Sequence, residues 1–220
     1  MKKNELTWLA EGGLMIALSI VLEVVSKMFI PGMPFGGHIT AASMLPVIIV
    51  GWKYGIGKGL VTGIVYALVE IALGANTIGA MILPSSEDYL GNIGKVVLMI
   101  LLDYIIAFTV IGLSGMYKNV IKNNALSLAL GAFTVIVLRY LCHVVSGYIL
   151  FGSYAEWFFT QDGFPAWGQA ILAKYNGQLL SLIYSLIYNA TFMLPEAIIT
   201  TIAAGIIGNV PQVMGTKSIK

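Results

Sequence analysis

Long apolar stretches, separated by short polar or turn-forming segments, run through the whole chain and restrict what it can fold into. Hydrophobic residues make up 58% of the 220 residues and charged residues only 10%. Soluble domains carry roughly 25% charged residues, because charge keeps their surface hydrated. A helix that crosses a membrane needs about 20 predominantly apolar residues. The chain is therefore predicted to be an all-α, polytopic membrane protein that lipid solvates.

The ends of the apolar stretches predict about six transmembrane helices in one domain that covers residues 1–220. Polar, glycine and proline residues punctuate the sequence between them. The helices are expected near residues 8–29, 39–52, 57–75, 93–116, 125–151 and 178–208. The long segment between the last two contains Trp157 and Trp167, and it is predicted to be an outer loop with aromatic residues at the membrane interface.

The distribution of lysines predicts the orientation in the membrane. With six helices, eight lysines fall on one side and three on the other. The eight are Lys2, Lys3, Lys53, Lys58, Lys118, Lys122, Lys217 and Lys220, and the three are Lys27, Lys95 and Lys174. Cytoplasmic loops carry an excess of basic residues. Both termini are therefore expected in the cytoplasm, in a multi-pass protein of the cell (plasma) membrane.

Several function classes find little support in the composition. A net charge of +2 does not favour nucleic-acid binding. A single cysteine, Cys142, can form neither a disulfide framework nor a thiolate metal site. No metal-ligand cluster and no nucleophile beside a base is evident. We therefore expect no metal, no cofactor and no enzymatic activity.

Ionisable residues inside the predicted spans are the first candidates for function, because a charge in hydrocarbon is costly. They are Glu23, Glu70, Asp103, Arg139, His143 and Glu196. In the six-helix arrangement most of them fall in the outer half of the membrane. Several helices therefore bring polar and aromatic groups to one depth, as a ligand cavity open to the outside requires.

The predicted fifth helix carries a polar stripe. Arg139, His143, Gly147 and Phe151 follow one another at intervals of four residues, and Ser146 adjoins them. This spacing puts them along one face of a helix. Arg139 is interpreted as the partner of an intramembrane carboxylate, which would hold the bundle together. His143 is interpreted as a contact to a ligand.

The pair Asp103 and Tyr104 lies near the middle of the predicted fourth helix. A carboxylate at that depth must face the protein interior and find a partner. The partner is either Arg139 or a cationic substrate. Aromatic faces attract cations by roughly 0.5 to 2 kcal/mol. Tyr184 adds a further ring and Asn189 an amide that can donate and accept hydrogen bonds. The combination suits a flat organic cation.

The predicted first helix contains Gly13 and Ala17, four residues apart. Small residues at this spacing allow a second helix to approach closely. The pattern fits packing within the bundle, and it also fits the docking of a separate membrane protein.

Four segments, taken together, resemble the substrate-binding S components of energy-coupling-factor (ECF) vitamin transporters, and most closely the thiamine-specific S component. They cover the second, fourth, fifth and sixth predicted helices in the same order. The segments are Gly37-His38-Ile39-Thr40 with Met44-Leu45-Pro46 and Tyr54-Gly55, Leu102-Asp103-Tyr104-Ile105-Ile106-Ala107-Phe108 with Gly112-Leu113-Ser114-Gly115, Arg139-Tyr140-Leu141-Cys142-His143-Val144-Val145-Ser146-Gly147 with Phe151-Gly152-Ser153-Tyr154-Ala155, and Tyr184-Ser185-Leu186-Ile187-Tyr188-Asn189.

The resemblance implies a six-helix fold with a thiamine pocket near the outer face. The binding positions that it implies are Asp103, Tyr104, His143, Phe151, Tyr184 and Asn189, and weaker candidates are Phe35, Glu70 and Tyr148. Two of these positions depart from the family pattern. The family usually has glutamate where this chain has Asp103, and tryptophan where it has Phe151.

The resemblance also implies partners in the membrane. The face of the first helix that carries Gly13 and Ala17 would dock on a transmembrane coupling subunit, which is itself attached to two ATPase subunits. Three other functions stay open from the residues alone. They are an S component for another vitamin or precursor, an ion-coupled transporter, and a membrane enzyme that uses Asp103 and His143 as acid and base.

Overall fold

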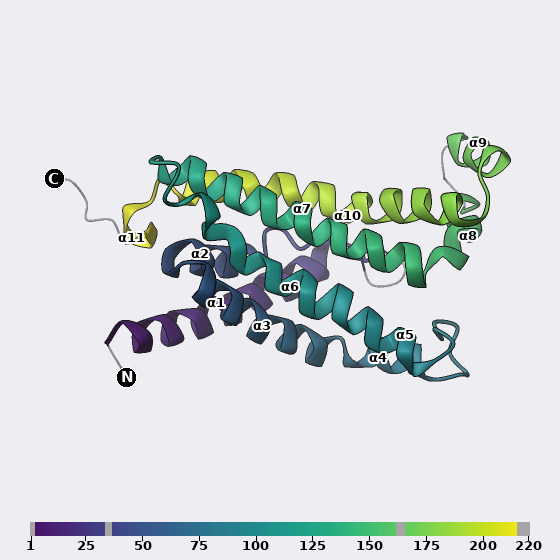
Figure 1. Cartoon of the computed structure of the whole chain (residues 1–220), viewed down its shortest axis with the longest axis horizontal. Helices are drawn as coiled ribbons and strands as arrows, with labels where there is room; N and C mark the ends of the chain where they lie inside the picture. The colour runs from purple at the N-terminus through teal and green to yellow at the C-terminus, as the bar shows by residue number, and fades with distance from the viewer. Residues whose placement is uncertain (1–2, 34–36, 162–165, 215–220) are drawn as a thin grey trace.

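The computed structural model describes residues 3–33, 37–161 and 166–214, which form helices joined by turns and loops (Figure 1). Within these residues five helical stretches are long and apolar enough to cross a membrane. Four of them are the single helices α1 (Lys3–Phe29), α3 (Ile56–Leu73), α7 (Asn124–Leu150) and α10 (Gly177–Ile207). The fifth, Ile93–Tyr117, is made of α5 (Ile93–Met99), η2 (Ile100–Ile106), α6 (Ala107–Thr109) and η3 (Val110–Tyr117). The predicted all-α class is confirmed.

The second predicted helix differs from the structure. We expected it over residues 39–52, whereas α2 runs from Leu45 to Tyr54 and has 10 residues. At 1.5 Å per residue it measures about 15 Å, which is half of the roughly 30 Å hydrocarbon core. The residues before it form turns, and Ala41 and Ala42 have φ values of 41° and 66°. These left-handed conformations keep the helix from extending backwards from Pro46, which lies in its first turn.

A buried carboxylate holds the non-helical segment in place. Glu196 on α10 is 1% exposed and accepts hydrogen bonds from the backbone N–H groups of Thr40 (2.8 Å) and Ala42 (3.2 Å). The hydroxyls of Thr40 (3.2 Å) and Thr200 (3.1 Å) donate to it as well. A buried backbone N–H without a partner costs free energy. Glu196 therefore satisfies donors that a continuous helix would have satisfied internally.

The connections between the long helices contain shorter ones. These are α4 (Ala75–Ile82), α8 (Ala155–Phe159), α9 (Trp167–Lys174) and, near the C-terminus, α11 (Pro211–Met214). Figure 1 shows α8 and α9 at one end of the elongated bundle and both chain termini at the other. The N- and C-terminal ends therefore lie on the same side of the bundle.

Small residues bring the helices into close contact on the side of the bundle near the termini. A methyl group added at Gly59 of α3 would overlap the carbonyl oxygen of Gly112 in η3. Nearby, the Ser114 hydroxyl donates to the Ile48 carbonyl (2.7 Å), and Trp52 Nε1 donates to the Ser127 hydroxyl (3.0 Å). Lipid is as apolar as leucine, so close packing and hydrogen bonds have to hold these helices together.

This close contact can be tested with two matched glycine substitutions on α3. Gly59→Ala should destabilise the protein by about 1–3 kcal/mol, because the new methyl group forces the two backbones apart. Gly57→Ala, two residues earlier, meets nothing within 4 Å and should leave stability unchanged or slightly higher. Thermal unfolding in detergent compares the two. Equal melting temperatures would contradict the contact between α3 and η3.

Candidate functional site

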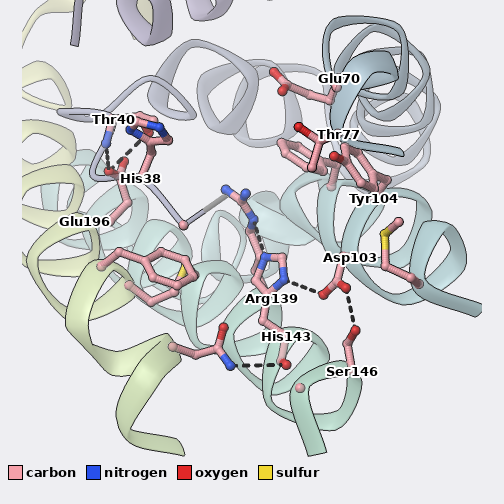
Figure 2. A pocket seen from close by; sticks show the side chains of 18 of the residues that line it. His38, Thr40, Glu70, Thr77, Asp103, Tyr104, Arg139, His143, Ser146 and Glu196 are labelled. Atoms are coloured by element: carbon pink, nitrogen blue, oxygen red, sulfur yellow. Dashed lines mark hydrogen bonds and ion pairs between the residues drawn. The ribbon is translucent and has the colours of Figure 1, made fainter. Parts of the chain in front are cut away.

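A cavity of about 330 Å³ lies among α1, α3, η2, α7, α10 and the non-helical residues before α2 (Figure 2). This volume is at the lower end of the roughly 300–1,000 Å³ that small-molecule sites occupy. Its walls carry an unusual share of ionisable side chains for a membrane interior. Figure 2 shows them pointing inward from several elements, and they include Glu70, Asp103, Arg139 and His143.

Asp103 and His143 form the centre of a hydrogen-bonded network. His143 Nδ1 lies 2.7 Å from Asp103 Oδ1, and the Ser146 hydroxyl donates to Asp103 Oδ2. On the other side of the ring, Arg139 Nε–H donates to His143 Nε2 (3.2 Å). Because Nε2 accepts this bond, Nδ1 carries the proton of the neutral ring and donates it to Asp103. The network fixes both the tautomer and the orientation of the imidazole.

The carboxylate partner of Arg139 that the sequence suggested is not found. Across the described residues no carboxylate lies within 4.0 Å of its guanidinium. The group instead covers the ring of Phe108, 4.2 Å from the ring centre, and contacts the sulfur of Met44. Asp103 is satisfied by His143 and Ser146. The positive charge of Arg139 thus remains available to the cavity.

Asp103 lies in an irregular part of its helix. The seven residues Ile100–Ile106 form η2, a π-helix between the α-helical segments α5 and α6. A π-helical turn holds an extra residue, and such turns occur often at functional sites. Nothing in the sequence pattern signals it. The adjacent Tyr104 also lines the cavity, and its ring stacks on Phe108 at 6.3 Å.

The helix α10 contributes an amide and two tyrosine rings. Asn189 Nδ2 donates to the carbonyl oxygens of Ser185 (2.8 Å) and His143 (3.2 Å). Its amide nitrogen is therefore engaged, and the side-chain oxygen is the atom left for a ligand. Tyr184 and Tyr188 pack at 5.7 Å between ring centres. The missing side chain of Gly147 allows α7 to approach α10 at this point.

The cavity gathers most of the predicted binding positions. Its lining includes Asp103, Tyr104, His143, Phe151, Tyr184, Asn189 and the weaker candidate Glu70. Tyr148 instead lines a separate surface groove with Glu156 and Gln178. Phe35 lies outside the described residues. The predicted docking residues Gly13 and Ala17 are exposed on α1, ten and six residues before Glu23 in the cavity wall.

Other lining residues were not predicted as contacts. Tyr66, Phe108 and Phe192 add rings, and Thr77 adds a hydroxyl. The spacing of Tyr66 and Glu70, one helical turn apart, is a signal that could have found the first of them. The remaining three come from elements whose relative position only the folded chain defines.

The cavity offers groups that can bind a small molecule. The described residues contain no group of three or more His, Cys, Asp or Glu side chains that could hold a metal ion. They do combine a fixed carboxylate–imidazole pair, an amide oxygen and several aromatic rings. These groups are complementary to the charge, edge and faces of a flat, polar heterocycle. Fold and site together define a membrane-embedded binding protein for a small molecule of this kind.

Comparison with known proteins identifies the family. The model of the thiamine transporter protein family (Thia_YuaJ) matches residues 9–214. The thiamine transporter ThiT of Bacillus subtilis (strain 168) is 33% identical over 210 residues, which cover 91% of this chain and 90% of that protein. The chain belongs to the thiamine transporter family, and it is a transport protein rather than an enzyme.

A solved structure shows the same fold. The structure of ThiT from Listeria monocytogenes superposes with a TM-score of 0.65 at 18% sequence identity. The match covers 96% of this chain and 99% of that one. The all-helical architecture is therefore shared over nearly the full length of both chains.

Proposed function

We propose that this protein is the thiamine-capturing S component of an ECF transporter. The observation that carries the proposal is the convergence of Asp103, His143, Asn189 and several aromatic rings on one cavity within the membrane. Thiamine joins an aminopyrimidine to a thiazolium cation that bears a hydroxyethyl arm. It therefore needs a negative charge, an acceptor for its amino group and aromatic faces. The cavity offers all three, and family membership supports the choice of ligand.

Each candidate contact has a chemical role in this proposal. The Asp103 carboxylate balances the charge of the thiazolium, and His143 presents a neutral ring beside it. The free side-chain oxygen of Asn189 accepts a hydrogen bond from the amino group of the pyrimidine. Phe151 and Tyr184 supply faces for the two rings. Cation–π attraction contributes up to about 2 kcal/mol where water is excluded.

We infer the direction of transport from the lysines at one end of the bundle. Lys53, Lys58 and Lys118 lie near one another at the end that carries the termini. Lys118 donates to the Lys53 carbonyl (2.8 Å), and burial together with the charge of Lys53 lowers the pKa of Lys118. By the positive-inside rule this end is cytoplasmic. Thiamine then enters from the opposite, outer face.

The helix α1 is the proposed docking surface for the transmembrane coupling subunit, which in turn carries two ATPase subunits. Gly13 and Ala17 are exposed, and a side chain at Gly13 would meet nothing within 4 Å. Large apolar residues beside them, Leu14 and Leu18, are also exposed, at 66% and 44%. A smooth face of small residues permits the backbone of a second helix to approach.

Binding of thiamine by the purified protein tests the proposal together with the role of Asp103. Asp103→Asn keeps the shape but removes the charge. A charge-assisted contact contributes about 1.5–3 kcal/mol, so affinity should fall at least about tenfold. Asp103→Glu should retain binding because it retains the charge. Glu156→Gln, in the short helix α8 and outside the lining of the cavity, serves as the control. Unchanged affinity in a folded Asp103→Asn protein would contradict the assignment.

The size of the aromatic face is tested at Phe151. The indole ring presents a larger and more electron-rich face to a cation. Phe151→Trp should therefore bind thiamine at least as tightly as the wild type, in the same equilibrium titration. A large loss of affinity would mean that Phe151 packs against the neighbouring Tyr154, 6.4 Å away between ring centres, rather than against the ligand.

Docking is tested by adding bulk to α1. Gly13→Trp or Ala17→Trp should abolish thiamine uptake by cells that contain the coupling subunits, because the indole blocks close approach of the helices. Both variants should still bind thiamine when purified. Ile198→Trp adds the same group to an exposed face of α10 and should leave uptake intact. Uptake that survives in both α1 variants would place the docking surface elsewhere.

A further inference from the structure

The connection between α7 and α10 contains a short helix, α8, that packs on the bundle at the end opposite the termini. Figure 1 shows it beside the first turns of α10, and the two helices are in contact. Its side chains divide into two faces. Ala155, Phe158 and Phe159 are buried, whereas Glu156 and Trp157 are exposed. Positions i, i+3 and i+4 share one face of a helix. The helix α8 is therefore docked on the bundle by its phenylalanines.

Contacts made by η4 (Gly152–Tyr154) fix where α8 begins. A side chain at Gly152 would overlap the Ser181 hydroxyl of α10, so the chain passes close over that helix as it leaves α7. The Ser181 hydroxyl donates to the Gly152 carbonyl (3.4 Å). The Tyr154 hydroxyl donates to the carbonyl of Glu87, in the loop between α4 and α5 (3.4 Å). These contacts hold the start of α8 against two separate parts of the bundle.

Phe158 contacts two rings that line the cavity. Its ring centre lies 5.3 Å from that of Tyr184 and 5.9 Å from that of Tyr188, with interplanar angles of 68° and 79°. Such edge-to-face pairs are an arrangement that the charge distribution of aromatic rings favours. Both tyrosines line the cavity, whereas Phe158 is outside its lining and is 6% exposed. Phe158 therefore supports the two tyrosines from behind.

The rings continue from these tyrosines to the polar centre of the site. Tyr188 packs against Phe192 at 5.8 Å, and Phe192 packs against the His143 ring at 6.2 Å, between ring centres. His143 in turn contacts Asp103. A row of rings thus runs from α8 to the carboxylate–imidazole pair. In a close-packed row, each ring restricts the positions that are open to the next.

The freedom of a ring before binding affects affinity. A side chain that is already held in its bound orientation loses little conformational freedom when the ligand arrives, whereas a mobile one must be ordered at a cost. Leucine in place of Phe158 would fill most of the same space but would present no ring edge to Tyr184 and Tyr188. The tyrosine rings would then gain freedom that ligand binding has to remove.

We propose that Phe158 is a positioning residue, and that α8 thereby strengthens ligand binding in a cavity whose lining it does not join. The inference rests on the proposed function, because thiamine is the ligand whose binding is measured. The sequence predicted only an outer loop with interfacial aromatic residues between α7 and α10. Phe158 gives this segment a second role, which is to hold Tyr184 and Tyr188 in the orientation that meets the ligand.

Equilibrium titration of thiamine onto the purified full chain tests this role. Phe158→Leu should weaken binding by about three- to tenfold, because the two aromatic contacts that hold the tyrosines are lost. Phe159→Leu is the matched control, since Phe159 is also buried on α8 and its ring contacts that of Trp167 at 6.3 Å between centres. The control should unfold at a lower temperature, as core substitutions do, but should keep the wild-type affinity. Equal losses of affinity in both variants would overturn the positioning role.

A double variant separates positioning from a general loosening of the fold. Tyr184→Leu removes one of the rings that Phe158 holds. Phe158→Leu should therefore cost less affinity in the Tyr184→Leu protein than in the wild type, because the effects of contacting residues do not add. Phe158→Met, whose flexible side chain fills irregular space, replaces the leucine variant if that variant does not fold.

Two results would overturn the role of Phe158 while leaving the proposed function intact. They are an unchanged affinity in a folded Phe158 variant, and losses that add fully in the double variant. A wild type that binds no thiamine would overturn both the positioning role and the proposed function.

Discussion

The fold depends on how the chain satisfies its backbone polar groups at membrane depth. No water is available there, so irregular backbone is tolerated only where protein or a hydrated cavity supplies partners. The turns before α2 meet this condition through Glu196, whose two carboxylate oxygens accept from the backbone of Thr40 and Ala42. Because α2 can then begin late, the preceding residues form a wall of the cavity instead of a full helical span.

The cavity concentrates charge that the rest of the membrane interior avoids. Three carboxyl groups that line the cavity differ in the hydrogen bonds that they accept. Glu196 accepts hydrogen bonds on both carboxylate oxygens, Asp103 is held by His143 and Ser146, and the Oε1 atom of Glu70 has no hydrogen-bond partner among the described residues. Buried polar groups are costly when unpaired. The number of hydrogen bonds therefore distinguishes Glu196, which holds the wall, from Glu70.

The two halves of the bundle differ in how closely their helices pack. On the side near the termini, glycines and serines of α2, α3 and η3 bring backbones into contact. On the other side, residues of the π-helical turn η2 and aromatic rings of α10 line the cavity. Close packing and hydrogen bonds hold the helices together in the half near the termini.

Much of this could be predicted from residues alone, because lipid imposes simple rules. Apolar length located the long spans, and the cost of charge in hydrocarbon singled out Asp103 and His143, which meet in the cavity. The shortened α2, the π-helical turn at Asp103 and the separation of Arg139 from every carboxylate in the described part of the chain were decided only by the tertiary structure. These features depend on which groups from distant helices satisfy one another, and hydropathy and spacing within a single helix carry no information about that pairing.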